Sequence, residues 1–109
     1  MIWQRDDIIQ LLLEAGRLAV HFRREPGARH KADGSVVTRA DTAVEHLLRQ
    51  ELHDPAQGRW VIGEEGEDRQ PMAAAELQRA MEQNAFIVDP IDGTAPYANG
   101  LPNWGISIG

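Results

Sequence analysis

The sequence predicts a layered α/β or α+β fold, because segments of helical periodicity alternate with short apolar segments of strand length. Apolar residues recur at three- and four-residue spacing over residues 5–24 and again over residues 41–52. Two apolar runs follow, Trp60–Ile62 and Ala85–Val88, and each is followed within two residues by a carboxylate. With 109 residues, the chain can form at most one small domain.

The first expected element is an amphipathic helix from about Arg5 to Arg24. Asp6 and Asp7 lie in its first turn, where acidic side chains complement the helix dipole, and Pro26 ends it. Its apolar face consists of Ile8, Ile9, Leu11, Leu12, Ala15, Leu18, Ala19 and Phe22. We expect this helix to pack against the rest of the fold and to carry no chemistry.

A polar loop over residues 27–35 leads into a short strand expected at Val36–Thr38. A second helix is predicted from about Asp41 to Leu52, with Asp41 or Thr42 as its N-cap. Its apolar face consists of Val44, Leu47, Leu48 and Leu52.

The remaining elements alternate between strand and helix. A buried strand is expected at Trp60–Ile62, a short helix at Met72–Gln83 and a second buried strand at Ala85–Val88. A tight turn over Asp89–Thr94 follows that strand. The last segment, Trp104–Gly109, alternates like the opening of a further strand, and we expect it to form an open sheet edge.

The most informative segment for chemistry is the turn from Asp89 to Thr94, which reads Asp-Pro-Ile-Asp-Gly-Thr. Pro90 favours an extended conformation at Asp89, and Gly93 lets the backbone approach a ligand closely. We expect the turn to aim Asp89, the Ile91 carbonyl and Asp92 at one point. Such an all-oxygen set suits Mg²⁺ better than zinc.

The apolar strand before this one also ends in carboxylates, Glu64 and Glu65. Two strands that deliver carboxylates at their C-terminal ends predict a metal site at one edge of a sheet.

The charge distribution agrees with a metal site. Residues 1–60 contain nine acidic and nine basic side chains, whereas residues 61–109 contain eight acidic and two basic ones, so the whole net charge of −6 lies in the second part. Clustered carboxylates repel one another unless a cation screens them. There is no basic stripe or aromatic ladder, so no nucleic-acid partner is expected.

The composition excludes several other classes. The chain has no cysteine, which excludes disulfides and thiolate metal sites. The four histidines have no paired metal-ligand spacing, and we expect His46 and His53 on the surface of the second helix. No apolar run has the length of a transmembrane segment and the N-terminus does not resemble a signal peptide, so the expected location is the cytoplasm.

Three segments, in this order, resemble the inositol monophosphatase family of Mg²⁺-dependent, lithium-sensitive phosphatases. They are Lys31–Asp41 (Lys-Ala-Asp-Gly-Ser-Val-Val-Thr-Arg-Ala-Asp), Gly63–Glu65 and Asp89–Thr94. The segments Gly100–Pro102 and Ser107–Ile108 also fit. The resemblance implies the layered α/β sandwich of the sugar-phosphatase type.

The same resemblance implies a ligand set for two or three Mg²⁺ ions. Glu64, Asp89 and the carbonyl of Ile91 would hold the first ion. Asp89 would bridge to the second ion, which Asp92 also binds. Glu65 would hold a water molecule or a third, weaker cation, or would face solvent.

Catalytic roles are also implied by the resemblance. Thr94 would lie beside the attacking water and Asp41 would hydrogen-bond to Thr94, while Glu64 supports the catalytic metal. Asp92, Gly93 and Thr94 would bind the substrate phosphate, the last two through backbone N–H groups at a helix start. Lys31 would lie close to the active site; the alternative for this lysine is an ordinary surface position.

The chain departs from the family pattern at three places. Val36 stands where the family usually has proline, and Pro96 stands where it usually has asparagine, which puts the local loop geometry in question. Family members are also longer, so residues 1–109 are expected to be the N-terminal part of a single domain. Its C-terminal half would contain the last metal aspartate and most substrate contacts, so the 109-residue chain is expected to be weakly active or inactive.

The predicted function is hydrolysis of a small phosphomonoester, with inositol monophosphate as the default substrate. A 3′(2′),5′-bisphosphate nucleotidase, a fructose-1,6-bisphosphatase or a histidinol-phosphatase would share the same metal motifs. An alternative hypothesis, which involves no enzymatic activity, is a fragment that binds metal or phosphate. A calcium loop of the EF-hand type is disfavoured, because Asp89 and Asp92 lack its ligand spacing. A homodimer is one candidate assembly, since the family often forms dimers.

Overall fold

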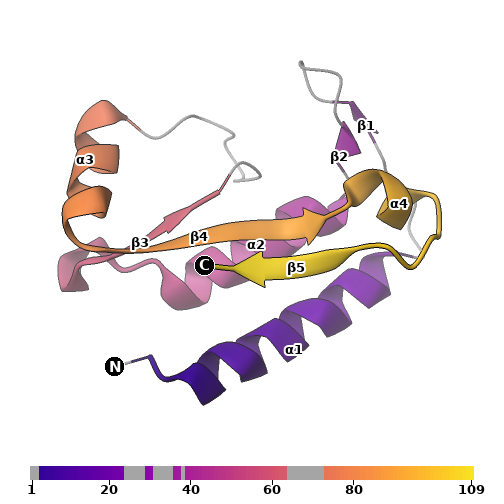
Figure 1. The fold of residues 1–109 in the computed structure, drawn as a ribbon, viewed down its shortest axis with the longest axis horizontal. Coiled ribbons are helices and arrows are strands. Elements are labelled where there is room, and N and C mark those ends of the chain that lie inside the picture. Colours follow the sequence, from indigo (N-terminus) through magenta and orange to yellow (C-terminus); the bar gives the residue numbers. More distant parts are fainter. Residues whose placement is uncertain (1–2, 24–28, 31–35, 38, 64–72) are drawn as a thin grey trace.

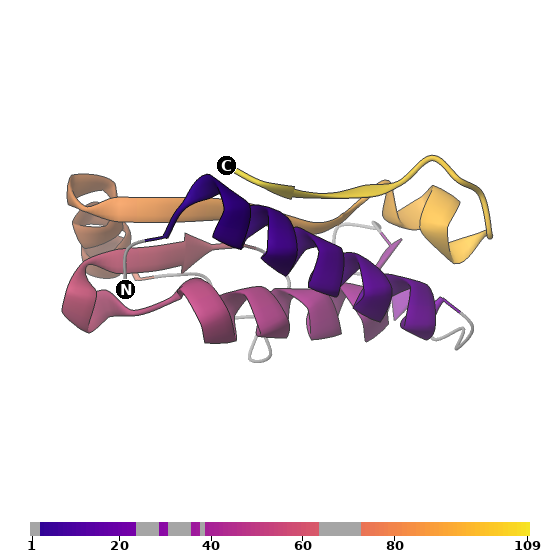
Figure 2. The same ribbon diagram turned by 90° about the horizontal axis from the view of Figure 1, so that it is seen from below.

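Two long helices and a mixed sheet form the two layers of the protein (Figure 1). The structure, a computed structural model, describes residues 3–23, 29–30, 36–37, 39–63 and 73–109. Helices α1 (Arg5–Phe22) and α2 (Arg39–Leu52) run side by side along one face of the sheet (Figure 2). This arrangement confirms the predicted layered α+β fold.

The three-stranded sheet has the order β3-β4-β5, formed by Arg59–Ile62, Asn84–Asp92 and Gly105–Ile108. Strands β3 and β4 are parallel, with Ile62 opposite Ile87, and β5 runs antiparallel to β4. The C-terminal ends of β3 and β4 therefore lie at the same end of the sheet. This confirms the strands predicted at Trp60–Ile62, Ala85–Val88 and Trp104–Gly109. It also confirms that the two strands followed by carboxylates end at the same edge of the sheet.

The tight turn predicted over Asp89–Thr94 is wrong in its position. Strand β4 continues to Asp92, because Asp89 pairs with Ser107 and Asp92 pairs with Gly105 of β5. The register is irregular between these two pairs, which is where Pro90 lies. Proline has no N–H to give to a regular ladder, so it is accommodated at such an irregularity. The turn itself is at Gly93.

The strand predicted to be buried at Ala85–Val88 is buried only in part. The helices cover one face only, and the side chain of Ile87 on the other face is 63% exposed. Val88, Pro90 and Ile91 are buried, whereas Asp89 and Asp92 are exposed.

The helix predictions hold apart from their ends. Helix α1 begins as expected, with the carboxylate of Asp7 accepting a hydrogen bond from the N–H of Gln4 at 2.9 Å. Helix α2 begins at Arg39, two residues before the predicted start, so neither Asp41 nor Thr42 is its N-cap. Asp41 lies instead within the first turn.

Five short elements complete the part of the fold that the structure describes. Residues 29–30 form β1 (Arg29–His30), which pairs with β2 (Val36–Val37) although a loop was predicted there. A 3₁₀ turn, η1 (Pro55–Gln57), precedes β3. Helix α3 (Ala74–Glu82) lies within the predicted range, while Thr38 and Met72 lie outside the described residues. Helix α4 (Thr94–Ala98) directly follows Gly93.

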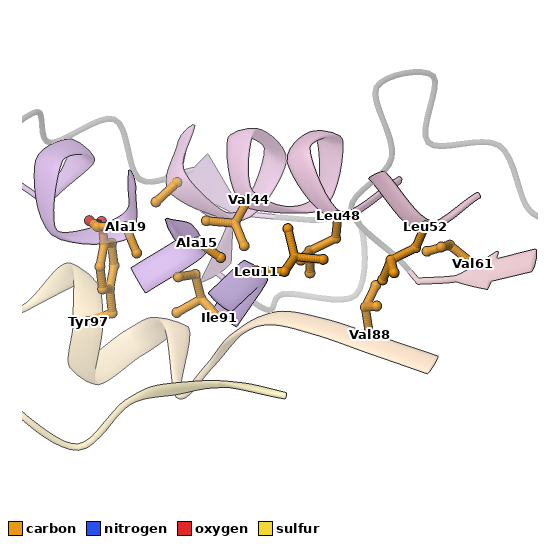
Figure 3. Close-up of a cluster of buried hydrophobic side chains, with 11 residues drawn as sticks. Leu11, Ala15, Ala19, Val44, Leu48, Leu52, Val61, Val88, Ile91 and Tyr97 are labelled. Carbon is orange, nitrogen blue, oxygen red and sulfur yellow. Dashed lines mark hydrogen bonds between the residues drawn. The ribbon is translucent and has the colours of Figure 1, made fainter. Parts of the chain in front are cut away.

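The core lies between the two helices and the sheet, as Figure 3 shows. Ile91 and Val88 of β4 point into it, and Ile91 is only 2% exposed. Its other labelled members are Leu11, Ala15, Ala19, Val44, Leu48, Leu52, Val61 and Tyr97. Burial of Ile91 anchors the end of β4, the strand that carries the predicted metal ligands.

Candidate active site

The irregularity in β4 determines which side chains reach solvent at its end. In a regular strand, successive side chains alternate between the two faces. Here Pro90 and Ile91 are both buried, so Asp92 is exposed like Asp89 instead of turning inward. The carboxylates of Asp89 and Asp92 are thereby both exposed at the surface, while the side chain of Ile91 anchors the strand in the core.

The hydroxyl of Thr94 links this strand end to helix α2. Its Oγ lies 3.1 Å from Oδ1 of Asp41 and 2.9 Å from the carbonyl oxygen of Ile91. The one hydroxyl hydrogen can be donated to either acceptor. Asp41 is 1% exposed and comes from the first turn of α2. The structure therefore contains the predicted contact between Asp41 and Thr94, and it also places the Ile91 carbonyl against Thr94.

Gly93 makes the change from β4 to α4 possible. Its φ is +83°, in the left-handed region that favours glycine. A Cβ at this position would also lie 2.5 Å from the backbone oxygen of Asn103. Helix α4 starts immediately afterwards, and the N–H of Tyr97 donates to the Gly93 carbonyl at 3.0 Å. The predicted helix start at Gly93 and Thr94 is confirmed.

Pro96 fits this helix without distortion. It occupies the third residue of α4, where a backbone N–H has no acceptor within the helix. The donor that proline lacks is therefore not needed for the helix, and its carbonyl accepts the N–H of Leu101 at 2.9 Å.

The other predicted site residues, Glu64, Glu65 and Lys31, lie outside the described residues. Within the part of the chain that the structure describes, no three His, Asp or Glu side chains gather as a metal-binding group. Gly63, the last described residue after β3, lies next to β4 and directly precedes Glu64 in the sequence.

A buried carboxylate, Glu45, was missed in the sequence. It is 0% exposed, and its Oε2 accepts a hydrogen bond from Nε of Arg49 at 3.0 Å. A Cβ on Gly63 would run into Oε1 of Glu45, so this oxygen lies against the backbone at the end of β3. The available signal was its position, because a glutamate one turn after Asp41 falls on the apolar face of α2.

His53 is half-buried and follows the end of α2, whereas a position on the surface of this helix was predicted. Its Nδ1 accepts the backbone N–H of Val61 at 3.0 Å, and its ring stands edge-on to Trp60, with the centroids 5.6 Å apart. Burial, and next the charge of Arg49, lower the pKa of His53 below its ordinary value, while Glu76 and Asp54 act in the opposite direction. His46 is exposed, as predicted.

An open pocket of about 900 Å³ lies at the other end of the sheet, lined by residues such as Trp3, Arg59 and Phe86. It contains none of the described site residues. The candidate site is therefore the end of β4 with the start of α4 and the first turn of α2, which lie at one end of the molecule in Figure 1.

Comparison with known proteins identifies the family of the chain. A model of the inositol monophosphatase family matches residues 5–109.

The chain belongs to the inositol monophosphatase family.

Its relatives carry different names. An inositol-1-monophosphatase of Rhizobium meliloti is 32% identical over 104 residues, covering 93% of this chain and 36% of that protein. A histidinol-phosphatase of Chlorobaculum parvum is 31% identical, covering 92% of this chain and 36% of that protein. A protein of Streptomyces griseus named glucose-1-phosphate thymidylyltransferase is 37% identical over 87 residues, covering 80% of this chain and 30% of that protein.

The fold comparison gives the same family. The solved structure of an IMPase of Thermotoga maritima matches with a TM-score of 0.71 and 28% identity, covering 94% of this chain and 37% of that one. The chain thus spans about a third of the length of the relatives that it matches. Members of the inositol monophosphatase family are generally metal-dependent phosphatases that act on small molecules.

None of the described helices is both long enough and apolar enough to span a bilayer.

Proposed function

We propose that residues 1–109 are the N-terminal part of a Mg²⁺-dependent phosphomonoesterase that hydrolyses a small phosphorylated metabolite. The observation that carries this proposal is the 3.1 Å contact between Thr94 Oγ and Asp41 Oδ1. It joins two motifs 53 residues apart in the sequence, beside the strand end that presents Asp89 and Asp92. A hydroxyl held by a buried carboxylate next to acidic side chains suits the activation of a water molecule.

The oxygen-only donor set at this strand end fits Mg²⁺, because Asp89 and Asp92 are both exposed there and the Ile91 carbonyl lies between them. Glu64, Asp89 and the Ile91 carbonyl would hold one ion, and Asp89 and Asp92 a second. Glu65 would hold a water molecule or a third ion. When bound, the cations neutralise charge on the phosphoryl oxygens and acidify the attacking water.

The residues of the chain would direct the proton of that water. Asp41 accepts the hydrogen of Thr94 Oγ, which leaves lone pairs of that oxygen free to accept a hydrogen bond from water. As the water attacks phosphorus and the ester P–O bond breaks, the proton of the water would pass to Thr94 Oγ and the threonine proton to Asp41, while the departing alkoxide would take a proton from solvent. The N–H groups of Gly93 and Thr94 would bind the phosphate, with Asp92 contributing through its cation.

Inositol monophosphate is the substrate that we propose first, because one of the relatives above is named inositol-1-monophosphatase. Histidinol phosphate is the second candidate, supported by the similarly covered histidinol-phosphatase. A bisphosphonucleotide or fructose 1,6-bisphosphate would suit the same metal ligands. The activity is proposed for the whole protein, because this chain spans about a third of the length of the relatives that it matches.

The test is phosphate release by the complete reading frame that contains residues 1–109. Inositol 1-phosphate, histidinol phosphate, adenosine 3′,5′-bisphosphate and fructose 1,6-bisphosphate are offered with and without Mg²⁺. We expect release that requires Mg²⁺, falls with lithium and is lost in Asp89→Asn, while Glu51→Gln, an exposed position of α2, retains it. Release from none of the four by a folded protein would overturn the proposed activity and leave the non-catalytic binding fragment.

A further inference from the structure

Helix α2 carries three charged residues four positions apart, Asp41, Glu45 and Arg49, which we call the α2 polar row. Each contacts a different segment near the strand ends. Asp41 contacts Thr94 at the start of α4, and Glu45 lies against Gly63 after β3. Arg49 donates to the carbonyl oxygen of Val61 in β3 at 3.3 Å. Residues at four-residue spacing lie on one helix face, so α2 contacts both the start of α4 and the end of β3.

The burial of Glu45 is not explained by packing alone. Its side chain is 0% exposed, whereas that of its partner Arg49 is 31% exposed. A buried ion pair often gives no more stability than apolar residues of similar volume, because its desolvation offsets its attraction. The adjacent positions of this face hold Val44 and Leu48, so an apolar residue would continue the stripe. A glutamate here therefore points to a role in local geometry.

The geometry around Gly63 identifies that role. An added Cβ would meet Glu45 Oε1, and would lie 2.9 Å from Cγ2 of Val88 in β4. The backbone at Gly63 is therefore enclosed between the Glu45 carboxylate and the neighbouring strand. The next residue in the sequence is Glu64, the carboxylate that the proposed function assigns to the first metal ion.

We propose that Glu45 is a positioning residue, which fixes the backbone of Gly63 at the end of β3, directly before the proposed metal ligand Glu64 in the sequence. This inference rests on the proposed function. The guanidinium of Arg49 donates one hydrogen bond to Glu45 and another to the carbonyl oxygen of Val61. These two hydrogen bonds attach β3 to α2. Outer partners that orient metal ligands affect metal affinity by about 10- to 100-fold when they are replaced.

The test is metal binding by the complete protein, measured by calorimetric titration with Mg²⁺ and by the electron paramagnetic resonance of bound Mn²⁺. In Glu45→Gln we expect the dissociation constant of the tightest site to rise about tenfold or more. At saturating Mg²⁺ the KM for substrate should be unchanged. The matched control is Glu51→Gln, which removes the same charge from an exposed position of α2 and should leave the affinity unchanged.

A second variant covers the case in which Glu45→Gln fails to fold. Glu45→Asp keeps the charge but withdraws it from Gly63, and we expect it to weaken metal binding by severalfold with the thermal midpoint largely retained. Metal affinity within twofold of the wild type, in a folded Glu45→Gln or Glu45→Asp protein, would overturn the inference.

Glu64→Gln separates this inference from the proposed function. If Glu64→Gln weakens binding but the folded Glu45 variants do not, only the positioning role fails. If Glu64→Gln leaves metal affinity unchanged, the proposed ligand set fails, and the positioning role fails with it.

Discussion

Individual residues hold the candidate site in place through constraints that few other side chains would satisfy. At Gly93 the backbone conformation and the available space both require glycine. At Asp41 a buried carboxylate receives the hydroxyl of Thr94. At His53 a ring nitrogen accepts a strand N–H that would otherwise be buried without an acceptor. Gly93 and Asp41 lie at the candidate site, whereas His53 follows the opposite end of α2.

Replacing Gly93 with alanine should destabilise the protein more than the same change at Gly100. Both glycines have positive φ, +83° and +75°, so both substitutions introduce strain of about 1–2 kcal/mol. Only at Gly93 does the new Cβ also meet a backbone oxygen, that of Asn103, whereas no atom lies within 4 Å at Gly100. Urea denaturation of both variants measures the difference. Equal losses would show that the contact with Asn103 relaxes without cost.

The stability of the protein should depend on pH through His53. Its folded pKa is lowered, first by burial and next by Arg49, so the unfolded state binds a proton more readily below the ordinary value of 6.5. The contribution is therefore complete above about pH 6.5 and is lost as the pH falls through the lower folded pKa. Protonation also removes the acceptor that Nδ1 offers to Val61.

His53→Asn tests this pH dependence, because the amide oxygen of asparagine can accept the same N–H but does not titrate. The free energy of unfolding, measured by denaturant titration between pH 5 and 7.5, should fall less steeply with acidification than in the wild type. His46→Asn, at an exposed position of α2, is the control. An unchanged slope in His53→Asn would contradict the assignment of this titration to His53.

Short elements depend on tertiary contacts, and α4 is the clearest example. It has five residues, too few for a stable isolated helix, yet it carries Thr94 at its first position. Tyr97 attaches it to the rest: its hydroxyl donates to the Ala19 carbonyl of α1, and its ring stands edge-on to Trp104. The Arg23 guanidinium lies over both rings and donates to the Leu101 carbonyl.

Tyr97→Phe should cost about 0.5–1.5 kcal/mol of stability, the usual net value of one hydrogen bond. The Ala19 carbonyl keeps the N–H of Arg23 as a donor at 3.0 Å, so no acceptor is left unsatisfied. Tyr97→Ala, which also removes the ring from the core, should cost about 3–5 kcal/mol. Chemical denaturation of the two variants distinguishes these contributions. Similar losses in both would indicate that the hydroxyl, and not the ring, attaches α4.

The existence of the long elements could be predicted from periodicity, whereas their ends depended on contacts between elements. The apolar spacing in α1 and α2 identified both helices, but the start of α2 at Arg39 was missed because no preceding residue was recognised as its cap. Strand β4 was predicted to end at Val88, because an Asp-Pro pair resembles a turn. Pairing with β5, a non-local interaction, extends it to Asp92.

The site could likewise be predicted only in part: residues within recognised motifs were identified, and a residue outside them was missed. Asp41, Ile91 and Thr94 belong to motifs with a characteristic order, and the structure brings them together. Glu45 belongs to no such motif, and only the fold reveals its contact with Gly63.

At the scale of the whole molecule, the face of the sheet that packs against the helices differs from the exposed strand end that carries the predicted metal ligands. The helices cover one face of the sheet, while the predicted metal ligands Asp89 and Asp92 remain exposed at the end of β4. The net charge of −6 falls within residues 61–109, the part that holds these ligands. The protein should be more stable when a divalent cation is bound at Asp89 and Asp92, since the cation relieves the repulsion between their carboxylates.

Mg²⁺ should therefore raise the thermal midpoint of the protein beyond the effect of ionic strength. A ligand that binds only the folded state stabilises it by RT ln(1 + [L]/Kd), about 2.7 kcal/mol at a concentration of 100 Kd. Sodium chloride at matched ionic strength screens charges without occupying the site and should give a smaller shift. In Asp89→Asn the two salts should act alike, because the proposed bridging ligand is lost. The exposed Glu82→Gln, also within residues 61–109, should retain the difference. Equal shifts from both salts in the wild type would indicate that the acidic charge is only screened and that this strand end does not bind the ion.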